Sequence, residues 1–164
     1  MNKAYISIRP HHFTDIMESF GRGERSFRPH PTYGHGVHTI SECLLQDKNV
    51  SLKIVLDIDD ICRPCIHNVN NICDDVIDTS YRPKAPNLKN DWMRLIDPRW
   101  CDKLKIKAGA QFSAYKLCER IRAKIRMRDF IDVYHEIPAS MTEQRYNNLV
   151  KGLEYYLDQN ENCH

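Results

Sequence analysis

The sequence predicts an α+β fold, with a small β-sheet near a cysteine-rich loop, several packed helices and a mostly helical C-terminal half. Two patterns support this prediction. Apolar residues alternate along "VSLKIVLDI" (50–58), as in a half-buried strand, and they recur at spacings of three and four near the C-terminus, as in a helix. With 164 residues, 41% of them hydrophobic, the chain is long enough to bury one core. We therefore expect a single domain over residues 1–164.

The N-terminal half begins with a predicted strand and helix. The segment "KAYISIR" (3–9) is rich in β-forming residues and alternates in polarity, so it predicts a short strand. Pro10 suits the first position of a helix, because its missing N–H would have no partner there, and this helix should end near Gly21. From there we expect a loop over 22–36, a helix over 37–47 and a strand over 50–58.

The C-terminal half is predicted to be helical. We expect helices over 88–97 and over 112–127, where good helix formers separate the apolar positions. A Ser-x-x-Glu capping box at Ser140 and Glu143 marks the start of a last helix. Its apolar face is formed by Tyr146, Leu149, Val150, Leu153 and Leu157.

The compartment is predicted from the N-terminus and the cysteines. The first residues, "MNKAYISIRPHH", lack the apolar run of a signal peptide, and no stretch approaches the ~18 apolar residues of a membrane span. We therefore expect a cytoplasmic protein without a membrane partner. Thiols stay reduced there, so seven cysteines, an odd number, indicate metal binding rather than disulfides.

Three of these cysteines stand in the segment "DDICRPCIHNVNNICDD" (59–75). Cys62, Cys65 and Cys73 form a Cys-x2-Cys-x7-Cys pattern, and thiolates in such a loop favour zinc or the iron of an iron–sulfur cluster. A redox pair or three half-buried structural cysteines are the alternatives. The aspartates of 57–60 do not fit an EF-hand loop, so we expect a solvated strand end there.

The segment "RPHHFTD" (9–15) is a second candidate. If Pro10 begins a helix, Asp15 shares a face with His11 or His12, and a carboxylate at that distance can fix the tautomer of a histidine that binds metal. The alternative is a polar first turn in solvent. The histidines of "HPTYGHGVH" (30–38) are interpreted as incidental residues of a mobile glycine-rich loop.

Charge is uneven in the second half of the chain. Residues 103–128 hold nine Lys or Arg and one acid, Glu119, whereas residues 129–161 hold seven acids and two basic residues. We expect the two regions to neutralise each other. Few aromatic residues are interleaved with the basic ones for base stacking, so we do not expect nucleic-acid binding.

Two motifs of this chain resemble those of a known family. Arg-Pro-His-His at 9–12 and Asp-Asp-Ile-Cys-x2-Cys at 59–65 are similar to motifs of small bacterial and archaeal proteins of unknown function that are regarded as iron–sulfur binding. The resemblance covers about residues 5–120. It implies a metal-binding core over 1–120 and a C-terminal helical extension over 121–164.

The resemblance also implies a set of ligands. Family members read His-His-Leu-Leu-Cys near the N-terminus and carry three cysteines in the later loop, so His11, His12 and the three loop cysteines match. Asp15 stands where the N-terminal cysteine of the family is expected. The fourth position in this chain is then filled by Asp15, a nearby histidine, water or substrate; we expect His12 or Asp15, with His11 and His67 as the next candidates. Charge favours His12, because three thiolates and a carboxylate on Zn²⁺ would sum to −2 beside the aspartates that flank the loop.

The sequence thus predicts a metalloprotein that binds an iron–sulfur cluster, or alternatively zinc, through Cys62, Cys65, Cys73 and a residue of the 9–15 segment. A non-cysteine position can stay open, which would allow catalysis on a small molecule or exchange with a redox partner. The alternative is a zinc-stabilised module that contacts a protein or RNA through the basic 103–128 stretch. The sequence leaves open whether the protein is an enzyme, which substrate it takes and how many copies assemble.

Overall fold

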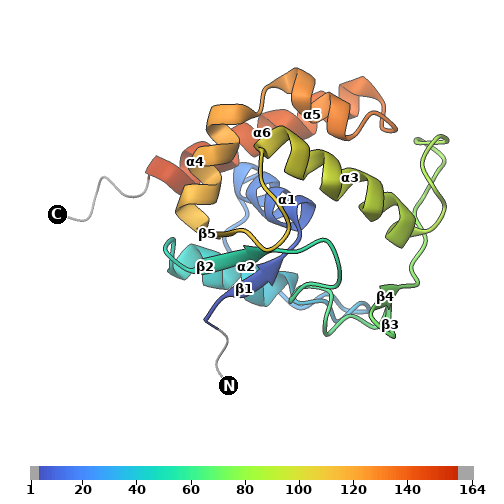
Figure 1. Ribbon diagram of the computed structural model, residues 1–164, viewed down its shortest axis with the longest axis horizontal. Helices are drawn as coiled ribbons and strands as arrows, with labels where there is room; N and C mark the ends of the chain where they lie inside the picture. Colours follow the sequence, from blue (N-terminus) through green and yellow to red (C-terminus); the bar gives the residue numbers. More distant parts are fainter. Residues whose placement is uncertain (1–3, 159–164) are drawn as a thin grey trace.

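The computed structural model describes residues 4–158 and confirms the predicted α+β class. The helices are α1 (Pro10–Gly21), α2 (Val37–Gln46), α3 (Lys89–Leu104), α4 (Ala114–Lys124), α5 (Met127–Val133) and α6 (Ala139–Asp158). The strands are β1 (Ile6–Ile8), β2 (Ser51–Ile54), β3 (Asn68–Val69), β4 (Ile72–Cys73) and β5 (Gln111–Ser113). In Figure 1 the strands β1 and β2 lie with α2 below α1, and helices α3 to α6 lie above it.

The main sheet has the order β1-β2-β5. Strands β1 and β2 are parallel, and β5 pairs antiparallel with β2 through Leu52 and Phe112. The predicted strand over 50–58 is correct in place but too long. Val55 donates its N–H to the carbonyl of Ile8, and the chain then leaves the sheet toward the cysteine loop. Ile8, Leu52 and Ile54 are fully buried and turn this sheet into one wall of the core.

The predicted helices agree with the structure in the N-terminal half and differ in the C-terminal half. Helices α1 and α2 begin where expected. Helix α3 continues past Pro98 instead of ending at residue 97, because the turns after the proline bury Trp100 and Leu104. The predicted helix over 112–127 is wrong at both ends, since its first residues belong to β5 and its last begins α5. Helix α6 begins at Ala139, one residue before the predicted cap Ser140.

Helix α6 is packed directly on α1. A side chain at Gly152 would overlap the carbonyl oxygen of Met17, and one at Gly21 would overlap the carbonyl oxygen of Asn148, so the two backbones touch. Glycine is needed at both positions because only hydrogen fits between the helices. The helix predicted as part of an extension therefore contributes to the same core as α1.

Within residues 4–158, no helix combines the length and apolarity required to span a membrane.

Candidate metal centre

The cysteine loop, the first turns of α1, the 33–37 segment and the start of α3 enclose a cavity of about 260 Å³. In Figure 1 the β3–β4 hairpin lies at the end of the molecule where α3 begins. All of the candidate ligands from the sequence line this one cavity: Cys62, Cys65, Cys73, His12 and Asp15. The two segments are far apart in sequence, and the fold brings them together because β1 and β2, which precede them, are parallel neighbours.

A tight hairpin explains the seven-residue spacing before the third cysteine. Strands β3 and β4 pair antiparallel, with Asn68 opposite Cys73 and Val69 opposite Ile72. The two residues between them, Asn70 and Asn71, have φ of 52° and 63°, the left-handed region in which asparagine is tolerated and which a type I′ turn requires. The turn brings Cys73 back beside Asn68, which is only three residues after Cys65, and both cysteines line the cavity.

The first two cysteines are set by a turn that an aspartate holds. The N–H of Cys65 donates to the carbonyl of Cys62 at 3.0 Å, and the N–H of Cys62 donates to Oδ1 of Asp59 at 2.9 Å. The loop is tied to β1 because Ser7 donates its N–H to Asp60 and its carbonyl accepts the N–H of Asp60. The loop that carries both cysteines is thereby fixed to β1, and both line the cavity.

Asp59 also orients His12. Its Oδ2 lies 2.7 Å from Nδ1 of His12 and accepts the N–H of Arg9 at 2.9 Å. Asp59 is fully buried, so the expectation of a solvated strand end is wrong at this residue. Burial disfavours its charge, but His12 and the backbone donors outweigh burial and lower the pKa of Asp59. Because the carboxylate only accepts, Nδ1 of His12 carries the proton and Nε2 stays available.

The same pair raises the pKa of His12. Burial opposes protonation of the ring, and the charge and hydrogen bond of Asp59 more than offset burial. The sequence assigned the role of acceptor to Asp15, and the structure corrects this. Asp15 is half exposed, and its Oδ1 accepts from Arg145 of α6 at 3.0 Å. Its carboxylate lines the cavity and already forms an ion pair with the guanidinium of Arg145.

A second carboxylate–histidine pair lies beside the first. Nδ1 of His11 lies 2.8 Å from Oδ1 of Asp97, which also accepts the N–H of His11, and Oδ2 of Asp97 accepts Nε of Arg9 at 2.7 Å. Asp97 is fully buried in α3, and burial lowers the pKa of His11. The rings of His11 and His12 are 4.1 Å apart. The sequence carried no signal for Asp97, because it lies 86 residues from His11.

Two further histidines line the cavity: His35, interpreted from the sequence as an incidental loop residue, and His67, expected only as a ligand in reserve after His12 and Asp15. His35 is brought in by a segment that is hydrogen-bonded to the cysteine loop, through Gly36 N–H to Ile61 and Ile66 N–H to Tyr33. Its Nδ1 is buried and has no hydrogen-bond partner among the described residues. His67, inside the cysteine loop, pairs with Asp74 at 2.8 Å. The glycine-rich loop is therefore part of the cavity wall.

The environment of the sulfurs determines their protonation. Burial raises the pKa of the Cys62 thiol, and the charge of Asp59 adds to this effect. Burial also raises the pKa of Cys73, although the backbone of Asp75 and the charge of Lys89 oppose the shift. Both thiols are neutral without a bound cation, so metal binding would release protons. None of the cysteines described forms a disulfide.

The distances between candidate ligand atoms group Asp59 with His12 and Cys62. Among residues 4–158, one set of three side chains, His12, Asp59 and Cys62, has its ligand atoms all within 4.8 Å of one another. Both oxygens of Asp59 already accept hydrogen bonds, so in this set it positions the other two side chains. The three sulfurs line the same cavity without forming such a compact set in this part of the chain.

The fold and this cavity define an α+β protein with a possible metal site built from cysteine and carboxylate-held histidine. The chain belongs to a family described as protein of unknown function (DUF1284), whose model matches residues 30–145. The match includes the three cysteines and continues 25 residues beyond position 120, where the sequence resemblance was expected to end, but does not include the histidines at 11 and 12. Neither the curated proteins nor the solved structures contain a match.

Proposed function

We propose that this protein is an iron–sulfur protein whose cluster is bound by Cys62, Cys65, Cys73 and Nε2 of His12. The observation that carries the proposal is the convergence of three thiols and a carboxylate-held imidazole on one cavity of about 260 Å³. A histidine that binds metal usually donates its other ring N–H to a carboxylate or carbonyl, which is the arrangement of His12 and Asp59.

The spacing of the sulfurs supports a cluster over a single zinc ion. Three thiolates on one zinc lie about 3.8 Å apart, because each Zn–S bond is about 2.3 Å long in a tetrahedron. Of the described side chains, the cysteines do not form a set within 4.8 Å. In a cluster the thiolates are distributed over different iron atoms, which keeps them farther apart.

The fourth ligand is argued from which side chains are still available. Asp15 is bound to Arg145, and both ring nitrogens of His67 face carboxylates, Nδ1 at 2.8 Å from Asp74 and Nε2 at 3.8 Å from Asp75. His12 has its Nδ1 engaged and its Nε2 unassigned, and as a neutral ligand it adds no negative charge beside Asp59 and Asp75. Replacing cysteine by histidine in a cluster raises its reduction potential. When bound, the cluster would supply electron transfer, and a redox partner or small molecule would exchange electrons at the cavity.

The test is metal and sulfide analysis of anaerobically purified protein. We expect brown protein that absorbs broadly near ~400 nm, is bleached by dithionite and contains iron and acid-labile sulfide. Replacing Cys62, Cys65 or Cys73 with serine should remove most of the iron, because a hydroxyl is a poor ligand for it. Cys43→Ser is the matched control, since Cys43 is also half-buried but lies outside the cavity in α2.

The outcomes separate the proposal from its alternatives. If the protein is colourless and holds one zinc ion per chain, and the three cysteine variants lose this zinc, the proposal of a cluster is wrong and the zinc-stabilised module is supported. Equal metal loss in Cys43→Ser and Cys62→Ser would contradict the ligand assignment altogether. The sequence also predicts that replacing Cys101, Cys118 or Cys163 leaves the metal content nearly unchanged; Cys163 lies outside the described residues.

A further inference from the structure

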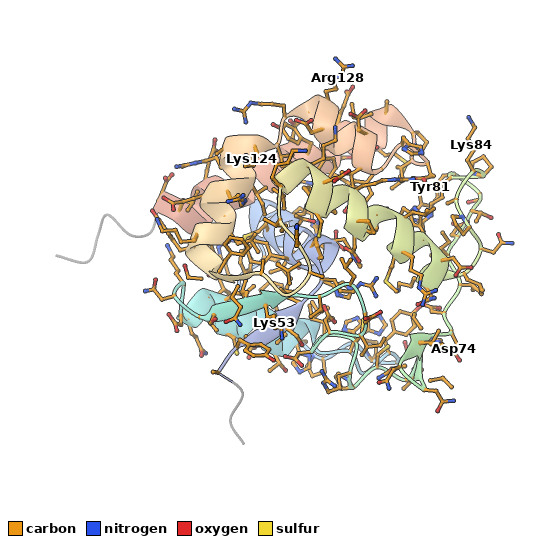
Figure 2. All side chains as sticks on the ribbon, viewed as in Figure 1. Lys53, Asp74, Tyr81, Lys84, Lys124 and Arg128 are labelled. Atoms are coloured by element: carbon orange, nitrogen blue, oxygen red, sulfur yellow. The ribbon has the colours of Figure 1, made fainter. Side chains whose placement is uncertain are left out.

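A second cavity of about 420 Å³ adjoins the metal cavity. It lies between α1, α3, α6 and the segment around Tyr81 that connects β4 to α3. The two cavities share part of their walls, namely His11, Asp15, Trp92 and Ile96. Figure 2 shows Tyr81 and Lys84 on the connecting segment that runs beside α3, with Lys84 near its outer end. Nothing in the proposed metal binding uses this second cavity.

Most of the charges in this cavity are already balanced. Arg145 of α6 bonds Glu18 at 2.8 Å and Asp15 at 3.0 Å, both on α1. Arg22 is exposed at the rim and pairs with Glu24 at 3.0 Å. These arginines have carboxylate partners within the protein and do not need another anion.

Arg82 differs from the other two arginines. Its guanidinium lies 4.3 Å from the centre of the Trp92 ring and 4.8 Å from that of Tyr81, and its Nε donates to the carbonyl of Asp78 at 2.7 Å. Within residues 4–158, no carboxylate forms an ion pair with it. Stacking and the Nε bond hold the guanidinium in one orientation and leave the fork of its terminal nitrogens without an anionic partner, the arrangement that suits a carboxylate or phosphate.

The rest of the wall is largely apolar. Trp92, Tyr134 and Ile137 are buried, and Met141 of α6 is 42% exposed at the mouth. Cavities that take small organic ligands have volumes of about 300–1,000 Å³, apolar walls and a few fixed polar groups. The second cavity has a volume in this range, and its apolar side chains face a wall that carries charged ones.

We propose that this cavity binds a small organic anion, a carboxylate or a phosphate monoester with an apolar body, whose acidic group is held by the terminal nitrogens of Arg82. The apolar body lies against Trp92, Ile137 and Met141. A ligand in this position contacts the wall that the two cavities share, which brings it next to His11. The inference depends on the second cavity and on Arg82, and it holds whichever metal the first cavity binds.

The experiment is calorimetric titration of the full-length, metal-loaded protein with three matched probes: benzoate, phenyl phosphate and neutral benzyl alcohol. We expect saturable binding of at least one of the two anions and much weaker binding of the alcohol, because only the anions satisfy Arg82. The two anions distinguish a carboxylate ligand from a phosphate ligand. Arg82→Gln should weaken binding about tenfold or more, the loss expected for a charge-assisted hydrogen bond.

Two further variants control this result. Lys84→Gln removes an exposed cation from the same segment and should leave the affinity unchanged. Met141→Trp should fill the mouth and block binding while Arg82 stays in place. Iron content and melting temperature of Arg82→Gln should match the parent, which separates this proposal from the metal proposal. Equal binding of benzyl alcohol and benzoate, unchanged affinity in Arg82→Gln, or no saturable binding of either anion would each overturn it.

Discussion

Asp59 is the residue on which the candidate metal site depends most. Its carboxylate accepts hydrogen bonds from the backbone of Arg9 and Cys62 and from the ring of His12. One side chain thus joins the end of β1, the start of the cysteine loop and the proposed histidine ligand. Since it is fully buried, its charge must be compensated by these donors, and loss of the charge would affect all of them.

Asp59→Asn is expected to lower metal affinity about tenfold or more. The amide keeps the size of the side chain but cannot accept from His12 and both backbone donors with the same strength, so the ring loses its fixed tautomer. Asp15→Asn is the matched control and should change affinity little, because Asp15 is bound to Arg145. Chelator competition on both purified variants measures the difference. A larger loss in Asp15→Asn would move the fourth ligand from His12 to Asp15.

The β3–β4 hairpin is the element that brings the third cysteine, Cys73, to the same cavity as Cys62 and Cys65. Asn70 and Asn71 both have positive φ, and asparagine adopts this left-handed conformation more readily than most residues. The turn that brings Cys73 back toward Cys65 therefore depends on asparagine at both positions. Replacing both with alanine should cost about 1–2 kcal/mol per residue and loosen Cys73, lowering stability in urea together with metal affinity. Asn71→Gly should be neutral or stabilising, because Asn-Gly is preferred in this turn. Unchanged urea unfolding of the double alanine variant would contradict the role of the turn.

The elements also differ in how far the sequence could predict them. Helices α1 and α2 were predictable because their apolar residues follow a helical period on one buried face. The strand at the start of the 112–127 segment was not predictable, because an apolar residue such as Phe112 fits a helix as well as a strand. Only its pairing with Leu52 makes it part of a strand. The cysteine spacing pointed to the cavity, whereas Asp59 and Asp97 act through contacts 47 to 88 residues away that no local pattern encodes.

At the scale of the whole molecule, α6 is joined to α1 by both packing and charge. Gly21 and Gly152 bring the two backbones into contact, and Arg145 reaches across to Asp15 and Glu18. Arg145 also lies 4.2 Å from the ring centre of Tyr134, which follows α5. The division into a core over 1–120 and an extension over 121–164 stays a prediction, and these contacts indicate that removing the extension would expose the buried face of α1.

In the basic stretch, Lys103 pairs with Asp129 and Asp132, which agrees with the expected neutralisation at that residue.

The contact between α1 and α6 should make stability depend on pH through Glu18. Glu18 is 3% exposed; burial and the charge of Asp15 raise its pKa from 4.5 to about 7, although Arg145 and Arg22 oppose this shift. Because the folded pKa lies above the unfolded one, protonated Glu18 stabilises the fold fully below about pH 4.5, and this contribution is lost as the pH rises to about 7. The free energy of unfolding should therefore fall across this range, by up to about 3 kcal/mol from this group.

Glu18→Gln tests this dependence, because the amide fills the same space and does not titrate. The difference in unfolding free energy between variant and parent, measured in urea at pH 5 and at pH 7.5, should shift in favour of the variant at the higher pH. Taking the difference cancels the contributions of His11 and His12, because both histidines are present in variant and parent. Asp59 and Asp97, whose pKa values are lowered, titrate below this range. If the difference is the same at both pH values, Glu18 is ionised throughout and Arg145 outweighs the burial of its carboxylate.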